Sequence, residues 1–266
     1  TPLYSSAASD VYKRQVGAIT KNTSSTSILT LSGANTYSGG TTVLAGVVRL
    51  GNASALGSAA AVVGVNANSL GSLDLNGQTI SNNLTINGGH TAGAITNTNA
   101  TAARASGTVT LNSASSIDGA NALTLSGVVT SNGHGLAFVG TGTYTLNNPA
   151  NTLATIATST TPVGGLSITN STELTIGSVV VNAVTYSGLR VAGDLAIFAP
   201  LRIGGNITTG GTQTYGGVVT LIADVSLATF TGGTGTTQAN RAINFNASVN
   251  GAFALTLSNG LSLIHI

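Results

Sequence analysis

The chain has 266 residues, of which only 5% are charged, and its formal net charge is +2. It contains no cysteine, which excludes a disulfide scaffold and thiol chemistry. Ordinary soluble domains carry about 25% charged residues, so the composition argues against a nucleic-acid-binding surface. No apolar run reaches the roughly 18 residues that predict a membrane-spanning helix. Solubility must therefore come from Thr, Ser, Asn and exposed peptide groups, as on the surface of a β-sheet.

The two ends of the chain differ from its middle. Residues 5–15 read SSAASDVYKRQ, which is the translation of a transposase-based sequencing adapter, and residues 261–266 match the reverse complement of the same transposon end. We therefore expect residues 1–15 and 261–266 to be adapter-derived segments, and residues 16–260 to be a fragment of a longer protein. A missing signal peptide or membrane anchor then carries no information.

Short β-prone segments alternate with Gly, Asn and Ser from residue 16 onward. Residues 28–31, 41–43 and 47–50 are each too short for a helix and are closed by Gly or Asn within a few positions. Residues 70–77, LGSLDLNG, alternate Leu and Asp as a half-buried strand would. Residues 89–106 hold few large apolar side chains, and we expect them to form a protruding loop.

Similar segments continue to the end of the chain. The sequence LTLSG at residues 29–33 recurs at 123–127, and its first four residues recur at 255–258. The three copies are separated by unequal numbers of residues. This favours an irregular solenoid over an exact tandem array. Small Ala, Gly, Ser and Val side chains suit the narrow lumen of stacked parallel coils, in which no coil could bury its face alone. The open hydrogen-bonding ends of such a stack are expected to promote self-association.

Two parts of the chain resemble known families. Residues 35–42 (NTYSGGTT), 45–52 (AGVVRLGN) and 55–57 (ALG) resemble the autotransporter passenger-associated repeat, and the wording from residue 135 onward, such as LAFVGTGTYTLNN at 136–148, resembles filamentous-haemagglutinin-like adhesins. The first resemblance implies a right-handed parallel β-helix that is exported to a bacterial cell surface and is often adhesive.

The expected fold class is therefore all-β, a right-handed parallel β-helix (β-solenoid) with irregular coils over residues 16–260. Within it we expect the passenger-associated repeat near residues 29–88 and haemagglutinin-like repeats near 135–258. Neither part contains a linker or a charge run that would mark a firm domain boundary. The resemblance to both families implies an outer-membrane β-barrel translocator, in cis or in trans, as a partner.

The search for chemistry yields one cluster, Arg190, Asp194 and Arg202. β-Helices host polysaccharide lyases and glycosidases, which need a carboxylate pair or a basic residue beside acids. The acids between residues 16 and 260 are far apart in sequence, and salt links or a solvated turn explain the cluster more simply. We therefore predict no catalytic residue and no enzyme.

Other candidate residues also have simple structural explanations. His90 and His134 each lie among glycines, where solvated turn residues are more common than metal ligands. Four tyrosines could stack on sugars, although core packing is the simpler interpretation. We predict no metal, no cofactor and no nucleic-acid partner. The tyrosines are Tyr37, Tyr144, Tyr186 and Tyr215.

The leading functional hypothesis is a fragment of a secreted bacterial adhesin stalk. It would bind a host-cell, matrix or bacterial surface ligand through distributed contacts, on the extracellular side of the outer membrane. Two alternatives stay open. One is a carbohydrate-active β-helix enzyme, for which Arg190, Asp194 and Arg202 would have to converge in a groove. The other is a passive biofilm or surface-layer component without a specific receptor.

Overall fold

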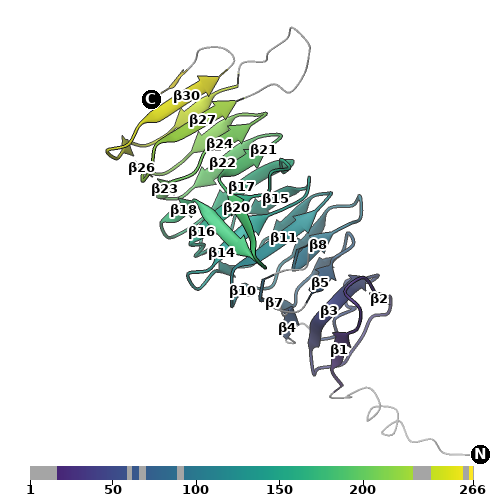
Figure 1. The fold of residues 1–266 in the computed structure, drawn as a ribbon. Coiled ribbons are helices and arrows are strands. Elements are labelled where there is room, and N and C mark those ends of the chain that lie inside the picture. The colour runs from purple at the N-terminus through teal and green to yellow at the C-terminus, as the bar shows by residue number, and fades with distance from the viewer. Residues whose placement is uncertain are drawn as a thin grey trace, which may run out of the picture.

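The computed structural model describes residues 17–58, 62–65, 70–88, 93–229, 241–259 and 264–265. These residues form strands and turns and no helix. The strands of successive coils lie parallel and stack into one elongated β-solenoid, which runs from β1 at one end to β30 at the other (Figure 1). The prediction of an all-β solenoid is confirmed.

The strands form four faces of the solenoid, which we number in the order in which they appear along the chain. The first face contains β1 (Ile19–Asn22), the start of β3 (Thr41–Leu50), β4 (Val62–Val65), β7 (Asn83–Ile86), β10 (Val109–Leu111) and β13 (Val129–Thr130). The second face contains β2 (Ile28–Leu31), the end of β3, β5 (Gly71–Asp74), β8 (Ile95–Asn97), β11 (Ser115–Gly119), β14 (Gly135–Phe138), β16 (Thr155–Thr158), β18 (Leu174–Ile176), β23 (Leu201–Ile203), β26 (Val219–Leu221) and β29 (Val249–Asn250).

The third face contains β6 (Thr79–Ile80), β9 (Ala103–Ala105), β12 (Leu123–Leu125), β15 (Thr143–Leu146), β17 (Gly165–Thr169), β22 (Leu195–Phe198), β25 (Gln213–Tyr215), β28 (Ile243–Phe245) and β31 (Ile264–His265). The fourth face contains β21 (Leu189–Val191), β24 (Ile207–Thr209), β27 (Val225–Thr229) and β30 (Leu255–Asn259). The predicted adapter-derived segment 1–15 lies outside the described residues, and of residues 261–266 only β31 is described.

The core consists of side chains that stack from one coil to the next. On the first face, Leu84 pairs with Val109 and Val109 with Val129, and all three are buried. The threonines that follow them point outward. Three-residue strands with the pattern apolar, threonine, apolar therefore bury two side chains each, because successive strand residues point to opposite sides. On this face, a buried side chain such as Val109 stacks on the equivalent side chains of the coils before and after it, as expected for a solenoid.

The corner between the third face and the next coil requires residues without a side chain. A Cβ placed on Gly127 would lie 1.9 Å from the carbonyl oxygen of Gly107, and one placed on Gly107 would lie 2.2 Å from that of Asn82. Three coils therefore bring their backbones together at this corner. Only glycine, which has no Cβ, permits so close an approach at positions 107 and 127.

The cross-section of the solenoid changes near its middle. The first face ends with the single bridge between Thr130 and Thr152, and the fourth face begins with the single bridge between Val163 and Val191. Early coils thus pass through the first, second and third faces in order. Late coils pass through the second, fourth and third faces.

A β-hairpin is inserted in the coil where the change is completed. Its strands β19 (Ser178–Val181) and β20 (Val184–Ser187) are antiparallel, and the turn residues Asn182 and Ala183 have φ of 48° and 64°. Positive φ at both turn residues is the geometry of a tight two-residue hairpin. The hairpin lies across β14 and β16 (Figure 1), where Val179 packs against Ala137 and Ala157.

Two sequence predictions are wrong in this structure. The segment 89–106 is not a loop: β8 and β9 belong to the second and third faces, and Ala103 and Ala105 are buried. Residues 89–92 lie outside the described residues. Strand β5 is not half-buried either, because Asp74 is as fully buried as the leucines beside it.

Candidate functional site

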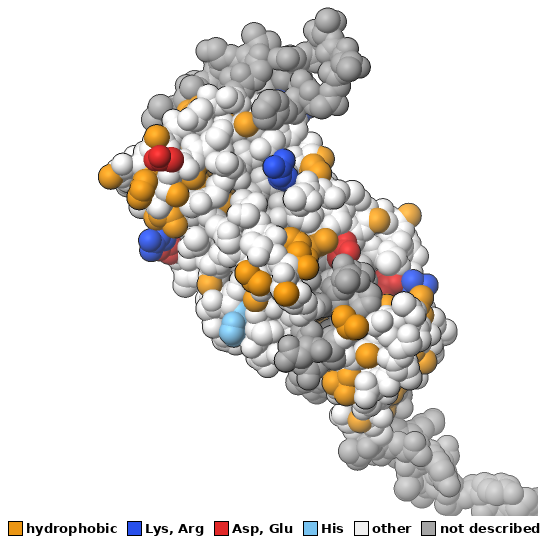
Figure 2. Space-filling view, viewed as in Figure 1, with side chains coloured by type: hydrophobic (Ala, Val, Ile, Leu, Met, Phe, Trp, Pro, Cys, Tyr) orange, Lys and Arg blue, Asp and Glu red, His pale blue; other side chains and the backbone are white. Residues whose placement is uncertain are grey.

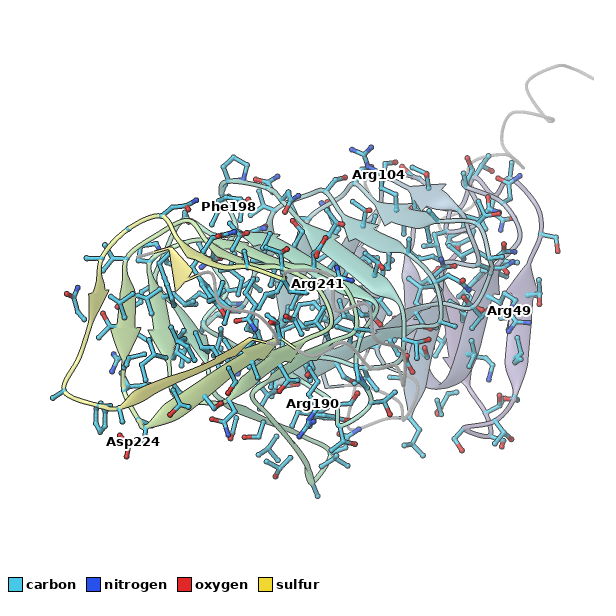
Figure 3. All side chains as sticks on the ribbon, turned by 90° about the horizontal axis from the view of Figure 1, so that it is seen from above. Arg49, Arg104, Arg190, Phe198, Asp224 and Arg241 are labelled. Atoms are coloured by element: carbon cyan, nitrogen blue, oxygen red, sulfur yellow. The ribbon has the colours of Figure 1, made fainter. Side chains whose placement is uncertain are left out.

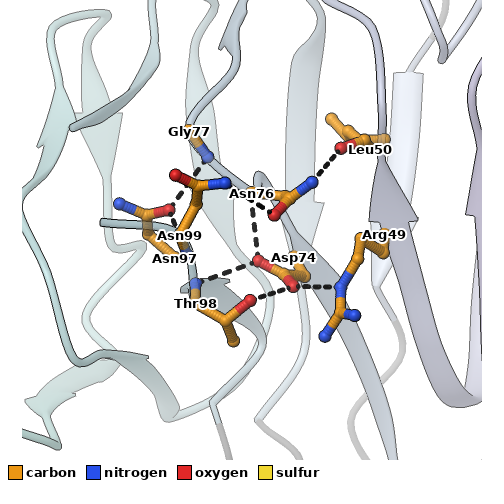
Figure 4. Close-up of polar contacts among 8 residues, drawn as sticks. All are labelled: Arg49, Leu50, Asp74, Asn76, Gly77, Asn97, Thr98 and Asn99. Carbon is orange, nitrogen blue, oxygen red and sulfur yellow. Dashed lines mark hydrogen bonds and ion pairs between the residues drawn. The ribbon is translucent and has the colours of Figure 1, made fainter. Parts of the chain in front are cut away.

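The buried carboxylate of Asp74 joins three consecutive coils (Figure 4). It accepts hydrogen bonds from Arg49 Nε at 2.8 Å, from the backbone N of Asn76 at 3.0 Å and from Thr98 Oγ1 at 2.6 Å. The backbone N of Thr98 donates a fourth, at 3.1 Å. Arg49 lies on β3, Asp74 on β5 and Thr98 directly after β8. A carboxylate so fully satisfied has a structural role.

Asparagines extend this polar contact along the same corner. Asn76, in a left-handed turn with φ of 49°, donates through Nδ2 to the carbonyl of Leu50 at 2.8 Å. The side-chain oxygen of Asn97 accepts from the backbone N of Gly77 at 3.0 Å, and Asn99 donates to Asn76 at 3.3 Å. Asn76 and Asn97 thus satisfy backbone groups at the end of β3 and in the turn after β5, which is how asparagine stabilises turns.

The structure separates the predicted cluster of Arg190, Asp194 and Arg202. Arg190 lies on β21 of the fourth face, whereas Arg202 lies on β23 of the second. Arg202 Nη1 is 3.5 Å from Glu173 Oε1, and both side chains are about half exposed. Asp194 Oδ1 accepts from the backbone N of Thr212 at 2.7 Å. The three residues therefore do not form one constellation, and sequence spacing alone missed the pairing of Arg202 with Glu173.

Arg190 is one of the residues that line a hollow of about 320 Å³ at the start of the fourth face. Pro162 and Ala192 contribute exposed side chains to it and Thr208 a half-buried one, whereas Val191 and Thr209, which also line it, are buried, with their side chains in the lumen. Figure 3 shows Arg190 at the margin of the ribbon, directed away from the lumen. Arg190 is the only charged residue of the described lining.

A second hollow, of about 310 Å³, lies where the first face ends. It is lined by three stacked turns, at residues 130–133, 152–154 and 172–173, and most of its side chains are small and polar. His134 follows the first of these turns and its backbone N bonds Ser131 O at 2.8 Å, so its place in a turn is confirmed. His90 lies outside the described residues.

Two of the four tyrosines are core residues. Tyr144 is fully buried and its ring lies 5.3 Å from that of Phe138, while Tyr215 stacks on Phe245 at 5.2 Å. Burial raises the pKa of both phenols, and for Tyr144 the charge of Asp118 raises it further. Burial likewise raises the pKa of Tyr37 and of Tyr186. All four are therefore neutral phenols near pH 7.

Burial also raises the pKa of the Asp118 carboxyl on the second face, and the hydrogen bond from the backbone N of Gly119 opposes this shift. Oδ1 accepts that bond at 2.6 Å. Among the described residues, no group of three or more His, Asp or Glu could hold a metal ion. In the same part of the chain, no helix has the length and hydropathy needed to cross a membrane.

Comparison with family models gives a match near the start of the described chain. Residues 24–50 match the model of the family described as passenger-associated-transport-repeat, and this segment contains β2 and β3. The match confirms the resemblance seen in the sequence, and the match and the solenoid together fit an autotransporter passenger repeat. Searches of curated proteins and of solved structures find no match to the chain. The haemagglutinin-like repeats expected near residues 135–258 stay a prediction.

Proposed function

We propose that this chain is a segment of the stalk of an exported bacterial adhesin, carried on an autotransporter passenger domain. The observation that carries the proposal is the position of the passenger repeat. Residues 24–50 supply β2 and the corner-turning strand β3, and the solenoid continues from them through both halves of the chain. A passenger repeat that leads directly into a long stack of coils is what a surface stalk requires.

The surface supports distributed binding. Figure 2 shows one face on which charged side chains are few and scattered, with small hydrophobic groups spread between polar atoms. Outward positions carry rows of hydroxyl groups, such as Thr85, Thr110 and Thr130 on the first face. Such a surface can offer many weak hydrogen bonds along its length, and many weak contacts add up through multivalency.

Binding, rather than catalysis, is proposed because the residues that would have to act together lie on different faces. Arg202 pairs with Glu173, and Asp194 is engaged with Thr212. A polysaccharide lyase or glycosidase remains the alternative from another class. Incubation with polygalacturonate and other glycans, followed by assay of new reducing ends and of unsaturated sugars, tests it. Turnover that is lost in Asp194→Asn would favour the enzyme over the adhesin.

The adhesin proposal is tested with the full chain. Beads coated with the protein are to be scored for attachment to epithelial cells, to matrix-coated surfaces and to bacteria, beside beads coated with heat-unfolded chain at equal density. We expect attachment to at least one surface that depends on the folded solenoid. Equal attachment by folded and unfolded beads on all three would refute a specific adhesive role and would favour the passive matrix component.

The export route and the partners belong to the same proposal. We propose that an outer-membrane translocator delivers the segment to the cell surface, either encoded in the same chain or as a separate protein. Self-association of stacked coils through their ends also stays a prediction. Sedimentation of the full chain over a range of concentrations tests it, and a constant monomeric mass would contradict it.

A further inference from the structure

We propose that the hollow that Arg190 helps to line is a binding site for one acidic sugar, recognised through its carboxylate. This inference rests on the proposed binding function and gives it a ligand class. The hollow of about 320 Å³ is at the small end of ligand pockets, which span about 300–1,000 Å³. Its size therefore suits a single sugar ring within a glycan, rather than a long stretch of chain.

The position of the hollow follows from the change in cross-section. Val163 makes one bridge to Val191, and the fourth face exists only from β21 onward. Pro162, just before that bridge, has no backbone N–H with which to extend the pairing to its neighbour. The new face is therefore open on the side of Pro162 and closed on the side of β24. This leaves a recess at a fixed place on a rigid stack.

The backbone of Arg190, which lines this recess, is held by a hydrogen bond to the preceding coil. Its N–H donates to Thr158 Oγ1 at 2.7 Å, which ties β21 to the end of β16. Val191, next to it, is buried. The guanidinium thus projects from a fixed strand position, and less freedom is lost on binding than for a side chain on a mobile loop.

The guanidinium has no acidic partner in the described part of the chain. The ion pairs found there are Arg49 with Asp74 and Arg202 with Glu173. Asp194, the acid nearest along the chain, has Oδ1 bound to the backbone of the next coil. An exposed arginine in a recess, without an internal carboxylate, is complementary to an external one, because its planar fork donates two parallel hydrogen bonds to a carboxylate.

The remaining lining favours a sugar acid over a small free anion. Pro162 and Ala192, whose side chains are exposed, offer apolar contact for the C–H face of a pyranose ring, while Thr208 offers a hydroxyl that both donates and accepts. A sulfate or phosphate would use the cation but leave the apolar wall unused. A uronic acid within a polysaccharide uses both.

The test uses the full chain and tri-galacturonate as the probe, with affinity measured by isothermal titration calorimetry. We expect binding to the acid and at least about tenfold weaker binding to its methyl ester, which keeps the ring but has no charge. Arg190→Ala is expected to weaken binding to the acid by at least about tenfold, the loss expected for one bidentate charged pair. Arg202→Ala is the matched control and is expected to bind like the unchanged chain.

Several results would overturn the inference. They are equal affinity for the acid and the ester, an equal loss in Arg190→Ala and Arg202→Ala, and no binding of tri-galacturonate at all. Binding of dextran sulfate that depends on Arg190 while tri-galacturonate fails would replace the carboxylate by a sulfate ligand and would also refute it. Circular dichroism of Arg190→Ala must match the unchanged chain. If bead attachment persists in Arg190→Ala while glycan binding was never present, the site fails and the adhesin proposal stands.

Discussion

Replacing Asp74 with alanine is expected to loosen three coils of the solenoid while leaving the rest intact. The carboxylate is fully buried and accepts four hydrogen bonds, from Arg49, from the backbone of Asn76 and from the backbone and side chain of Thr98. Its loss leaves these donors in a cavity between β3, β5 and the turn after β8. No other described residue offers a carboxylate to Arg49 within 4.0 Å.

The magnitude can be estimated from the exposure of the two charges. Removing one partner of a buried ion pair costs about 3–5 kcal/mol, because the other charge stays buried. The side chain of Arg49 is 34% exposed, so its guanidinium keeps part of its water and the lower end applies. The expected loss is therefore about 3 kcal/mol for the affected coils. Asp74→Asn, which keeps an acceptor for the two backbone donors, is expected to cost less.

The assay must resolve the molecule locally, because coils in a solenoid contact only their neighbours and long stacks do not unfold in one step. Native-state hydrogen exchange provides this. A loss of about 3 kcal/mol corresponds to about a hundredfold faster exchange, since each 1.4 kcal/mol is tenfold. We expect this acceleration in β3, β5 and β8, and unchanged exchange in β24 and β26.

Asp224→Ala is the matched control. Asp224 also links coils, but through one hydrogen bond to the backbone of Ala254 at 2.8 Å and at an exposed position. It is expected to cost no more than about 1 kcal/mol. The reasoning would be refuted if the two variants lost similar stability, or if Asp74→Ala accelerated exchange evenly along the whole chain.

Three further predictions concern other parts of the fold. Gly127→Ala is expected to lower the melting temperature strongly, because its Cβ would meet the Gly107 carbonyl at 1.9 Å, whereas Gly33→Ala, with its nearest contact at 3.5 Å, is the near-neutral control. Asp118→Asn is expected to raise the melting temperature at neutral pH and not at acid pH. The folded-state pKa of Asp118 is raised, so its contribution to stability is present below the ordinary value of 3.8 and is lost as the pH rises through the raised pKa; a constant difference across pH would contradict this. Val179→Ser is expected to speed exchange in β19 and β20 only, because this buried valine fixes the hairpin to the second face; equal acceleration in β14 would show that the coil depends on it.

The strand pattern could be predicted from the sequence because each strand is short and punctuated. Residues 28–31 were expected as a short β segment closed by Gly, and β2 has these bounds. The segment 89–106 misled because large apolar residues were taken as the mark of a core strand. Ala103 and Ala105 are buried in the core of the solenoid, so small residues in this segment belong to core strands and not to a loop.

The contacts that fix the coils could not be predicted from local sequence. Arg49 and Asp74 are 25 positions apart, and only the register of β3 with β5 places them side by side. Alternation of Leu and Asp therefore suggested an exposed acid where the structure has a buried one. The same limit applies to Arg190 and Arg202, because irregular coil lengths hide which face a residue joins.

The hairpin was missed although the sequence contains its signal. Residues 178–187 read SVVVNAVTYS, in which two valine-containing runs flank Asn182 and Ala183. Asn followed by Gly is the usual marker of a two-residue turn. Here Ala183 stands at the position of the glycine and adopts a φ of 64°. The burial of Val179 and Val181 against the second face offsets the strain that alanine incurs there.

The two hollows described above lie where the regular stack is interrupted. Where coils repeat with the same faces, the inner strands of each sheet pair with a strand on both sides. Where the first face stops, Thr130 pairs with the next coil through a single bridge, and where the fourth face begins, Val191 pairs with the preceding coil through a single bridge. The two hollows lie beside these positions. The hairpin is inserted in the same region, between β18 and β21. In the function proposed above, the regular coils supply the length of the stalk, and the transition between cross-sections supplies the proposed sugar site.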